Sequence, residues 1–252
     1  MLEAALSSFD TTMLMVIAGT FVLSGVVKGF LGIGLPTAAL GILTLLMSPT
    51  EAISLLIMPI IFTNAVQFYR ASNRLETAHK YKYFGLTIML SIFVTSLFIT
   101  SYPPGLLTVA IGIAMVVFSA NLLFGLSLPV GPGLNWQIGV GVVSGILGGL
   151  SSIWSPPVAM YLMARNTPKD EFIGAAGFLF LCGCFPLAAG LFLSGVVTAE
   201  TTVKSTFALI VALVGFRIGE IMRNRLSQKN FRTIILVAFL IMGGRLIAVG
   251  LF

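Results

Sequence analysis

The chain has 252 residues, of which 58% are hydrophobic and only 9% are charged. From residue 84 to residue 164 it contains no Asp, Glu, Lys, Arg or His. Several apolar runs reach the roughly 20 residues that a helix needs to cross about 30 Å of hydrocarbon. The composition therefore excludes a soluble globular protein and predicts an all-α polytopic membrane protein.

The formal net charge is +6, but most of the basic residues gather in two short segments. Lys and Arg bias the connecting segments of a membrane protein toward the cytoplasm. Topology therefore explains the positive charge, and we expect no nucleic-acid partner. The first cluster is Arg70, Arg74, Lys80 and Lys82, and the second is Arg217, Arg223, Arg225, Lys229 and Arg232.

The first apolar run ends in a segment broken by glycine and proline, from Gly25 to Pro36. A similar segment begins at Gly141, about 116 residues later, and reaches Pro156 and Pro157. Hydrocarbon offers no hydrogen bonds to an interrupted backbone, so such segments occur at membrane depth only where protein shelters them or they line a cavity. Paired interruptions in two halves of a chain are typical of transporters.

A second pair of matched segments follows the breaks. Residues 48–51 (Ser-Pro-Thr-Glu) and 167–170 (Thr-Pro-Lys-Asp) each combine a hydroxyl, a proline and an acid in the order typical of a helix start. We expect the hydroxyl residue of each to be the N-cap. The acids Glu51 and Asp170 then belong to capping signatures, and we favour that role over proton transfer.

These anchors divide one transmembrane domain, residues 1–252, into repeat 1 at about 12–125 and repeat 2 at about 135–252. Each repeat is predicted to hold a broken or re-entrant helical element followed by three transmembrane helices. The helices are expected at about 50–70, 82–100 and 104–125 in repeat 1, and at about 168–194, 200–220 and 231–252 in repeat 2.

With both basic clusters in the cytoplasm, the turn at Tyr102 lies outside and the 126–134 linker lies inside. Three further crossings per half then make the two repeats inverted. The segment 36–47 is about 18 Å long as a helix, which is too short to cross alone, so we expect it to be re-entrant. Its counterpart, 157–163, is shorter still. The pair would meet near the midplane from opposite faces, around a central site with two gates.

Repeated Gly-rich segments followed by proline, in a chain of about 250 residues with two similar halves, resemble the TauE/SafE sulfite exporter family. The resemblance covers essentially the whole chain. At 148–152 (Gly-Gly-Leu-Ser-Ser), serines stand where such proteins commonly carry a Gly-x-Gly-Gly-Gly run. The resemblance implies membrane export or uptake of small sulfur-containing or carboxylate anions, such as sulfite or an organosulfonate. From this and the two broken elements we expect a secondary transporter, an exporter, that works by alternating access in the inner membrane of a bacterial cell. An anion channel of the same architecture, or a carboxylate transporter, is the alternative.

Lys28 lies within the apolar run just before the first break. An ammonium at membrane depth is costly and is expected to pair or to face a cavity, so Lys28 is a candidate anion ligand. The alternative is a lysine that snorkels to the membrane interface. For Arg245, near the end of the last helix, we favour snorkelling over a place in a basic site.

The second break carries hydroxyl and indole groups that could bind sulfonate or sulfite oxygens beside helix N-termini, whose dipole favours an anion. Alternatively, the serines satisfy their own broken backbone and the tryptophan lies in the interfacial belt. Asn64 and Gln67, three residues apart on the helix that starts at Pro49, could bind the substrate or hold helices together. The candidate substrate-binding residues are Lys28, Ser151, Ser152, Trp154, Ser155, Asn64 and Gln67.

The sequence shows no Ser-His-Asp, Cys-His or metal-ligand set. The single histidine, His79, falls in a basic loop, and Cys182 and Cys184 are placed in an apolar run as buried thiols rather than as a disulfide or metal pair. We therefore expect no enzyme activity, no metal and no cofactor. The expected partners are a small anion and the lipid bilayer, and the sequence leaves the oligomeric state open.

Overall fold

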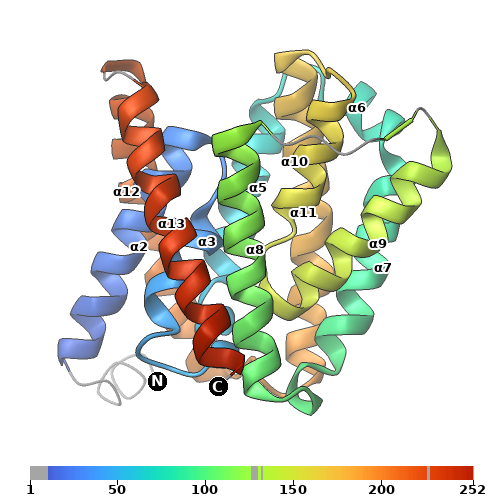
Figure 1. Cartoon of the computed structure of the whole chain (residues 1–252). Helices are drawn as coiled ribbons and strands as arrows, with labels where there is room; N and C mark the ends of the chain where they lie inside the picture. The colour runs from blue at the N-terminus through green and yellow to red at the C-terminus, as the bar shows by residue number, and fades with distance from the viewer. Residues whose placement is uncertain (1–10, 126–129, 132, 226–227, 252) are drawn as a thin grey trace.

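The structure, a computed structural model, describes residues 11–125, 130–131, 133–225 and 228–251. Within these ranges every regular element is a helix (Figure 1). Five of the described helices are long and apolar enough to cross a membrane, and α4 with α5 adds a sixth as a bent pair. The prediction of an all-α polytopic membrane protein is confirmed. The helices are α2 (Thr11–Leu31), α3 (Leu35–Leu43), α4 (Pro49–Leu55), α5 (Ile57–Arg70), α6 (Arg74–Lys80), α7 (Lys82–Leu97), η1 (Ile99–Ser101), α8 (Pro104–Phe124), α9 (Leu134–Ser151), α10 (Ser155–Ala164), α11 (Lys169–Leu193), α12 (Ala199–Arg225) and α13 (Gln228–Leu251).

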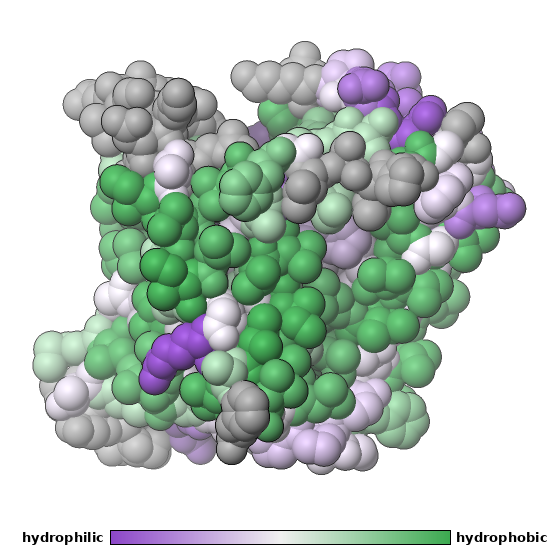
Figure 2. Space-filling view, in the orientation of Figure 1, coloured by the Kyte–Doolittle hydropathy of each residue, from purple (hydrophilic) through white to green (hydrophobic). Residues whose placement is uncertain are grey.

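The outside of the bundle carries the apolar side chains that contact with lipid requires. Many large hydrophobic residues are exposed, among them Leu90, Phe192 and Ile241. Figure 2 shows green, hydrophobic atoms across the middle of one face, with purple atoms gathered mainly toward its upper right. An apolar surface of this kind marks a membrane contact rather than a water-facing surface.

The connections between helices lie at the two ends of the bundle. In Figure 1, the connections from α5 to α7 and from α10 to α11 are at the upper end, where α8 also ends and α9 begins, and the turn from α7 to α8 is at the lower end. Parts of three predicted features lie outside what the structure describes. They are residues 126–129 and 132 of the linker, the side chains of the second basic cluster from Arg223 to Arg232, and the side chain of Asp170.

The helix predicted at 50–70 is wrong as a single element, because α4 and α5 meet there at a bend of 43°. Pro59 has no N–H to donate to the carbonyl of Leu55, four residues before it. That carbonyl instead accepts from Ser205 Oγ of α12 at 3.0 Å. The same hydroxyl accepts from the Met58 amide at 3.0 Å. One serine on another helix therefore satisfies the backbone on both sides of the bend.

The capping prediction is confirmed for α4 and wrong for α11. Ser48 Oγ accepts from the amide of Glu51 at 3.3 Å, while the Glu51 side chain is exposed. α11 begins later than predicted, with Pro168 at the N-cap and no side-chain capping bond. Thr167 belongs to the turn that ends α10 instead, because its amide donates to the carbonyl of Leu162 at 3.1 Å.

The two short helices after the breaks are nearly equal in length. α3 has 9 residues and α10 has 10, so the prediction that the second is the shorter is wrong. At 1.5 Å per residue each is about 15 Å long, roughly half the hydrocarbon thickness. In Figure 1, α3 runs downward and α10 runs upward in the interior of the bundle.

Glycines bring two pairs of helices to backbone contact. On α2, Gly29 faces α12, where an added Cβ would lie 2.1 Å from the Phe216 carbonyl oxygen. On α9, Gly145 faces α7, where an added Cβ would lie 2.3 Å from Ser91 Cβ. Small residues permit this close approach of membrane helices. The glycines that repeat in the sequence thus have the same packing role on two different partner helices.

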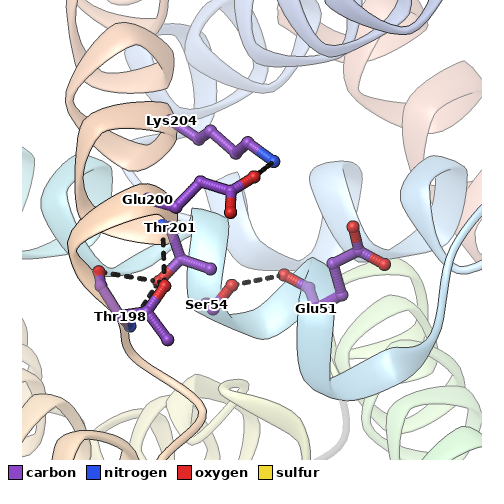
Figure 3. A network of polar contacts seen from close by, with 6 residues as sticks. All are labelled: Glu51, Ser54, Thr198, Glu200, Thr201 and Lys204. Atoms are coloured by element: carbon purple, nitrogen blue, oxygen red, sulfur yellow. Dashed lines mark hydrogen bonds and ion pairs between the residues drawn. The ribbon is translucent and has the colours of Figure 1, made fainter. Parts of the chain in front are cut away.

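The N-terminus of α12 is fixed by local polar contacts (Figure 3). The Thr198 amide donates to Thr201 Oγ1 at 2.8 Å, and the Thr201 amide donates to Thr198 Oγ1 at 3.2 Å. One turn later, Lys204 forms an ion pair with Glu200. Reciprocal bonds of this kind satisfy the amides that a helix start leaves unpaired, and they hold α12 where Ser205 reaches α4 and α5.

At the opposite end of the bundle, Glu171 of α11 forms hydrogen bonds with the residues just before α7. Its Oε1 accepts from Lys80 Nζ at 2.6 Å and from the Tyr81 hydroxyl at 2.8 Å. Burial, and then the hydrogen bond to Glu171, raise the pKa of Tyr81 above its ordinary value. The phenol therefore stays protonated and keeps donating at physiological pH.

Candidate functional site

The two breaks meet at one small cavity inside the bundle. Gly34, the N-cap of α3, and Trp154, the N-cap of α10, both line it. The volume open to the centre of a water molecule is about 20 Å³, which is room for roughly one water. Five of the predicted site residues line this cavity: Lys28, Asn64, Ser152, Trp154 and Ser155.

The first break depends on glycine at the turn between α2 and α3. Gly34 has φ +97°, in the left-handed region that side chains rarely adopt. A Cβ there would also lie 3.3 Å from the Phe118 ring. Pro36 follows in the first turn of α3, where its missing N–H leaves one fewer backbone donor to satisfy. The turn therefore reverses the chain direction with one unpaired backbone amide fewer to bury.

The second break places serine where the family resemblance leads one to expect glycine. Ser152 is the C-cap of α9 with φ +55°, a conformation that costs a residue with a Cβ about 1–2 kcal/mol. Its hydroxyl has no hydrogen-bond partner among the described residues. A buried, strained and unpartnered hydroxyl is unusual, because buried polar groups are normally satisfied.

Lys28 is buried in the last turn of α2 with 3% of its surface exposed, so it does not snorkel to the bundle surface. Its Nζ donates to Asn64 Oδ1 of α5. Asn64 Nδ2 donates in turn to Cys184 Sγ of α11 at 3.3 Å, and that thiol donates to the Phe180 carbonyl at 3.1 Å. The ion pairs of the described residues do not include Lys28. An ammonium buried without a carboxylate is suited to binding an anion.

Trp154 is also interior rather than part of an interfacial belt. Its side chain is 3% exposed and packs on two glycines. A Cβ added to Gly148 would lie 2.8 Å from Trp154 Cβ, and a Cβ added to Gly183 would lie 2.7 Å from the indole. The indole Nε1–H has no partner among the residues that the structure describes. Together with Lys28 and Ser152, it gives this cavity three kinds of hydrogen-bond donor.

Two predicted site residues lie elsewhere. Ser151 Oγ donates to the Leu147 carbonyl at 2.6 Å and accepts from the Ile153 amide at 3.1 Å. Ser151 thus satisfies the broken backbone, which was the alternative interpretation. Gln67 lines a larger cavity on the other side of Lys28.

The other ionisable and sulfur-containing residues do not extend the small cavity. Arg245 on α13 and His79 on α6 are both exposed. Cys182 and Cys184 are free thiols, the first half-buried and the second buried. Among the described residues, no group of three or more His, Cys, Asp or Glu is placed to hold a metal.

The contribution from α11 has no local signature in the sequence. Phe180 lines the small cavity, and Cys184 accepts a hydrogen bond from the side-chain amide of Asn64. In the sequence, both are apolar residues of an apolar helix like their neighbours. Only the side-by-side packing of α5 and α11 shows their role.

The fold and the site define a multi-pass helical membrane protein whose two interrupted segments enclose a buried basic side chain, a construction typical of secondary transporters. The chain belongs to the TauE/SafE sulfite exporter family, because the family model "Sulfite exporter TauE/SafE" matches residues 17–246. That range contains both breaks, and it confirms the resemblance stated from the sequence. Members of this family are membrane transporters. No curated protein and no solved structure matches the chain significantly.

Proposed function

We propose that the protein is a secondary transporter that exports small sulfur-containing anions, sulfite or organosulfonates, by alternating access. The observation that carries this proposal is the buried Lys28, without a carboxylate partner among the described residues, at the cavity where both breaks meet. Lys28, the Ser152 hydroxyl and the Trp154 indole would donate to the anion's oxygens. The positive dipole ends of α3 and α10, which both begin at this cavity, favour the same charge.

Inverted repeats would supply the two gates. Two observations support them: α2 runs upward and α9 downward in Figure 1, and the equivalent glycines pack α2 on α12 and α9 on α7. Under this symmetry, each half can adopt the conformation of the other. Exchange of the two conformations would open the site to each side of the membrane in turn.

A carrier fits the size of the site better than an open channel does. Room for about one water is less than sulfite needs, so binding requires the walls to move. The basic end of the bundle favours the cytoplasm. With the family, this supports a location in the inner membrane of a bacterial cell, with the bilayer and the anion as partners.

Titration calorimetry on the purified protein tests the site. We expect sulfite and ethanesulfonate to bind more tightly than acetate at matched ionic strength. Lys28→Ala should lower the affinity for sulfite by about tenfold or more, because a charge-assisted hydrogen bond is lost. Arg245→Ala, the matched loss of one exposed cation, should change it by less than about twofold. Unchanged binding in the Lys28 variant rejects the site, and tighter binding of acetate favours a carboxylate transporter.

Flux in proteoliposomes tests the mechanism. A carrier exchanges external labelled sulfite for internal unlabelled sulfite and accumulates the label transiently. Sulfite currents through single open pores, without this counterflow, would establish an anion channel instead.

A further inference from the structure

A second cavity, of about 650 Å³, extends from Lys28 to the end of the bundle that carries the first basic cluster. Four helices form its walls: α2, α5, α11 and α12. Lys28 lines both this cavity and the small one, so the lysine stands at the junction between them. This second cavity is called the recess, and Lys28 forms its inner end as well as part of the wall of the small cavity.

One face of α5 supplies polar groups along the recess. Asn64, Gln67 and Arg70 follow each other at three-residue intervals, which places them on the same side of the helix at steps of about 4.5 Å. Asn64 contacts Lys28 at the inner end, and Arg70 lies at the outer end. The opposing walls include the apolar side chains of Phe172 and Phe216. An oxyanion that moves inward along α5 would meet the guanidinium of Arg70, then the amide of Gln67, and then the ammonium of Lys28.

A single carboxylate holds two guanidiniums at the mouth. Glu220 Oε1 accepts from Arg70 at 2.9 Å, and Glu220 Oε2 accepts from Arg217 at 3.1 Å. The side chain of Glu220 is 16% exposed, whereas those of Arg70 and Arg217 are 63% and 72% exposed. The mouth thus carries two exposed guanidiniums against one carboxylate. Arg70 can exchange Glu220 for an incoming anion while Glu220 keeps Arg217 as its partner.

We propose that this recess is the route between the basic-loop side and Lys28, that Arg70 is the capture site for the anion, and that Glu220 gates the mouth by releasing Arg70. The proposal rests on the proposed function, because the anion captured is the cargo of that transporter.

Uptake of labelled sulfite from the basic-loop side tests the role of Arg70. Arg70→Gln should lower the initial rate at limiting sulfite by about five- to tenfold, leave the rate at saturating sulfite nearly unchanged, and flatten the dependence on ionic strength. Arg70→Lys, which keeps the charge, should recover most of the rate. Arg74→Gln is the matched control, because Arg74 belongs to the same basic cluster but donates to the Tyr69 carbonyl and lies outside the recess. Equal effects of Arg70→Gln and Arg74→Gln, or no recovery with lysine, overturn the capture role.

Thiol labelling tests the route without any transport. Gln67→Cys, in a variant with both native cysteines replaced by serine, should react with the impermeant reagent 2-sulfonatoethyl methanethiosulfonate added on the basic-loop side. Phe62→Cys, at an outward-facing and 48% exposed position of the same helix, should react at least tenfold more slowly in the bilayer. An unreactive Gln67→Cys overturns the route whatever the cargo. If wild-type protein binds no sulfite, the proposed function and the capture role fail together, and labelling still decides the route.

Discussion

Lys28 and Asn64 are hydrogen-bonded inside the bundle although 36 residues separate them in the sequence. The bond joins the end of α2 to α5, and the contact from Asn64 to Cys184 adds α11. Helices from both halves of the chain are therefore joined through Asn64, next to one buried ammonium. A shift of α5 relative to α2 changes the partner of that ammonium, and a shift of α11 changes the partner of Asn64, so helix movement alters the environment of Lys28.

The first prediction concerns Asn64 as the residue that orients Lys28. Asn64→Ala should lower sulfite affinity by about threefold to tenfold, less than Lys28→Ala, because the ammonium remains but loses its acceptor. The two changes should not add, and their coupling energy should be about 1 kcal/mol by titration calorimetry. Thr63→Ala is the control, since Thr63 bonds only the carbonyl of Pro59 among the described contacts and lines neither cavity. Strictly additive effects would show that Asn64 acts independently of Lys28.

The second prediction concerns the contact of α2 with α12. Gly29→Ala should destabilise the protein by about 1–3 kcal/mol, because the new methyl group collides with the backbone of α12. Gly19→Ala, on the same helix with nothing within 4 Å of the added Cβ, should be neutral or stabilising by up to about 1 kcal/mol. Unfolding in mixed micelles with increasing denaturing detergent measures both. Similar midpoints for the two variants would contradict the close packing.

Much of the helical framework could be predicted from the sequence, because long apolar runs separated by turn residues leave few alternatives. The bend at Pro59 could not be predicted in full. The proline signals a missing backbone bond, but its stabilisation depends on Ser205, which lies on α12 and shows no local pattern that points to Leu55.

The candidate site could be predicted where a charged residue falls at membrane depth, because burying that charge costs free energy. It could not be predicted where it depends on which side chains of two neighbouring helices touch. Lys28 stood out because an intramembrane charge demands a partner. Cys184 lies 120 residues from the amide it contacts, and an apolar helix gives no sign of which residues face a neighbour. Ser151 bonds its own broken backbone in the structure, but a serine hydroxyl in such a segment can equally bond a ligand, so the sequence alone does not separate the two roles.

The third prediction concerns the bend between α4 and α5. Ser205→Ala removes one group that serves both Leu55 and Met58, so it should cost about 1–3 kcal/mol of stability. Thr206→Ala, whose hydroxyl bonds the carbonyl of Thr202 within the same helix, should cost less than about 0.5 kcal/mol. Thermal unfolding followed by circular dichroism measures the difference. Equal loss in both variants would mean that the bend does not depend on the hydroxyl of Ser205.

The last prediction concerns the sides of the membrane reached by the two short helices. Leu46→Cys, after α3, and Arg165→Cys, after α10, should react with an impermeant maleimide from opposite sides of oriented vesicles, with both native cysteines replaced by serine. Ser101→Cys should react from the same side as Leu46→Cys, because both positions lie at one end of the bundle in the predicted topology. Arg74→Cys should react from the same side as Arg165→Cys, at the other end. α3 and α10 run in opposite directions (Figure 1), which supports this assignment. Labelling of Leu46→Cys and Arg165→Cys from the same side would bring both short helices in from one face. The site would then have a single entrance, and alternating access between two inverted halves would be untenable.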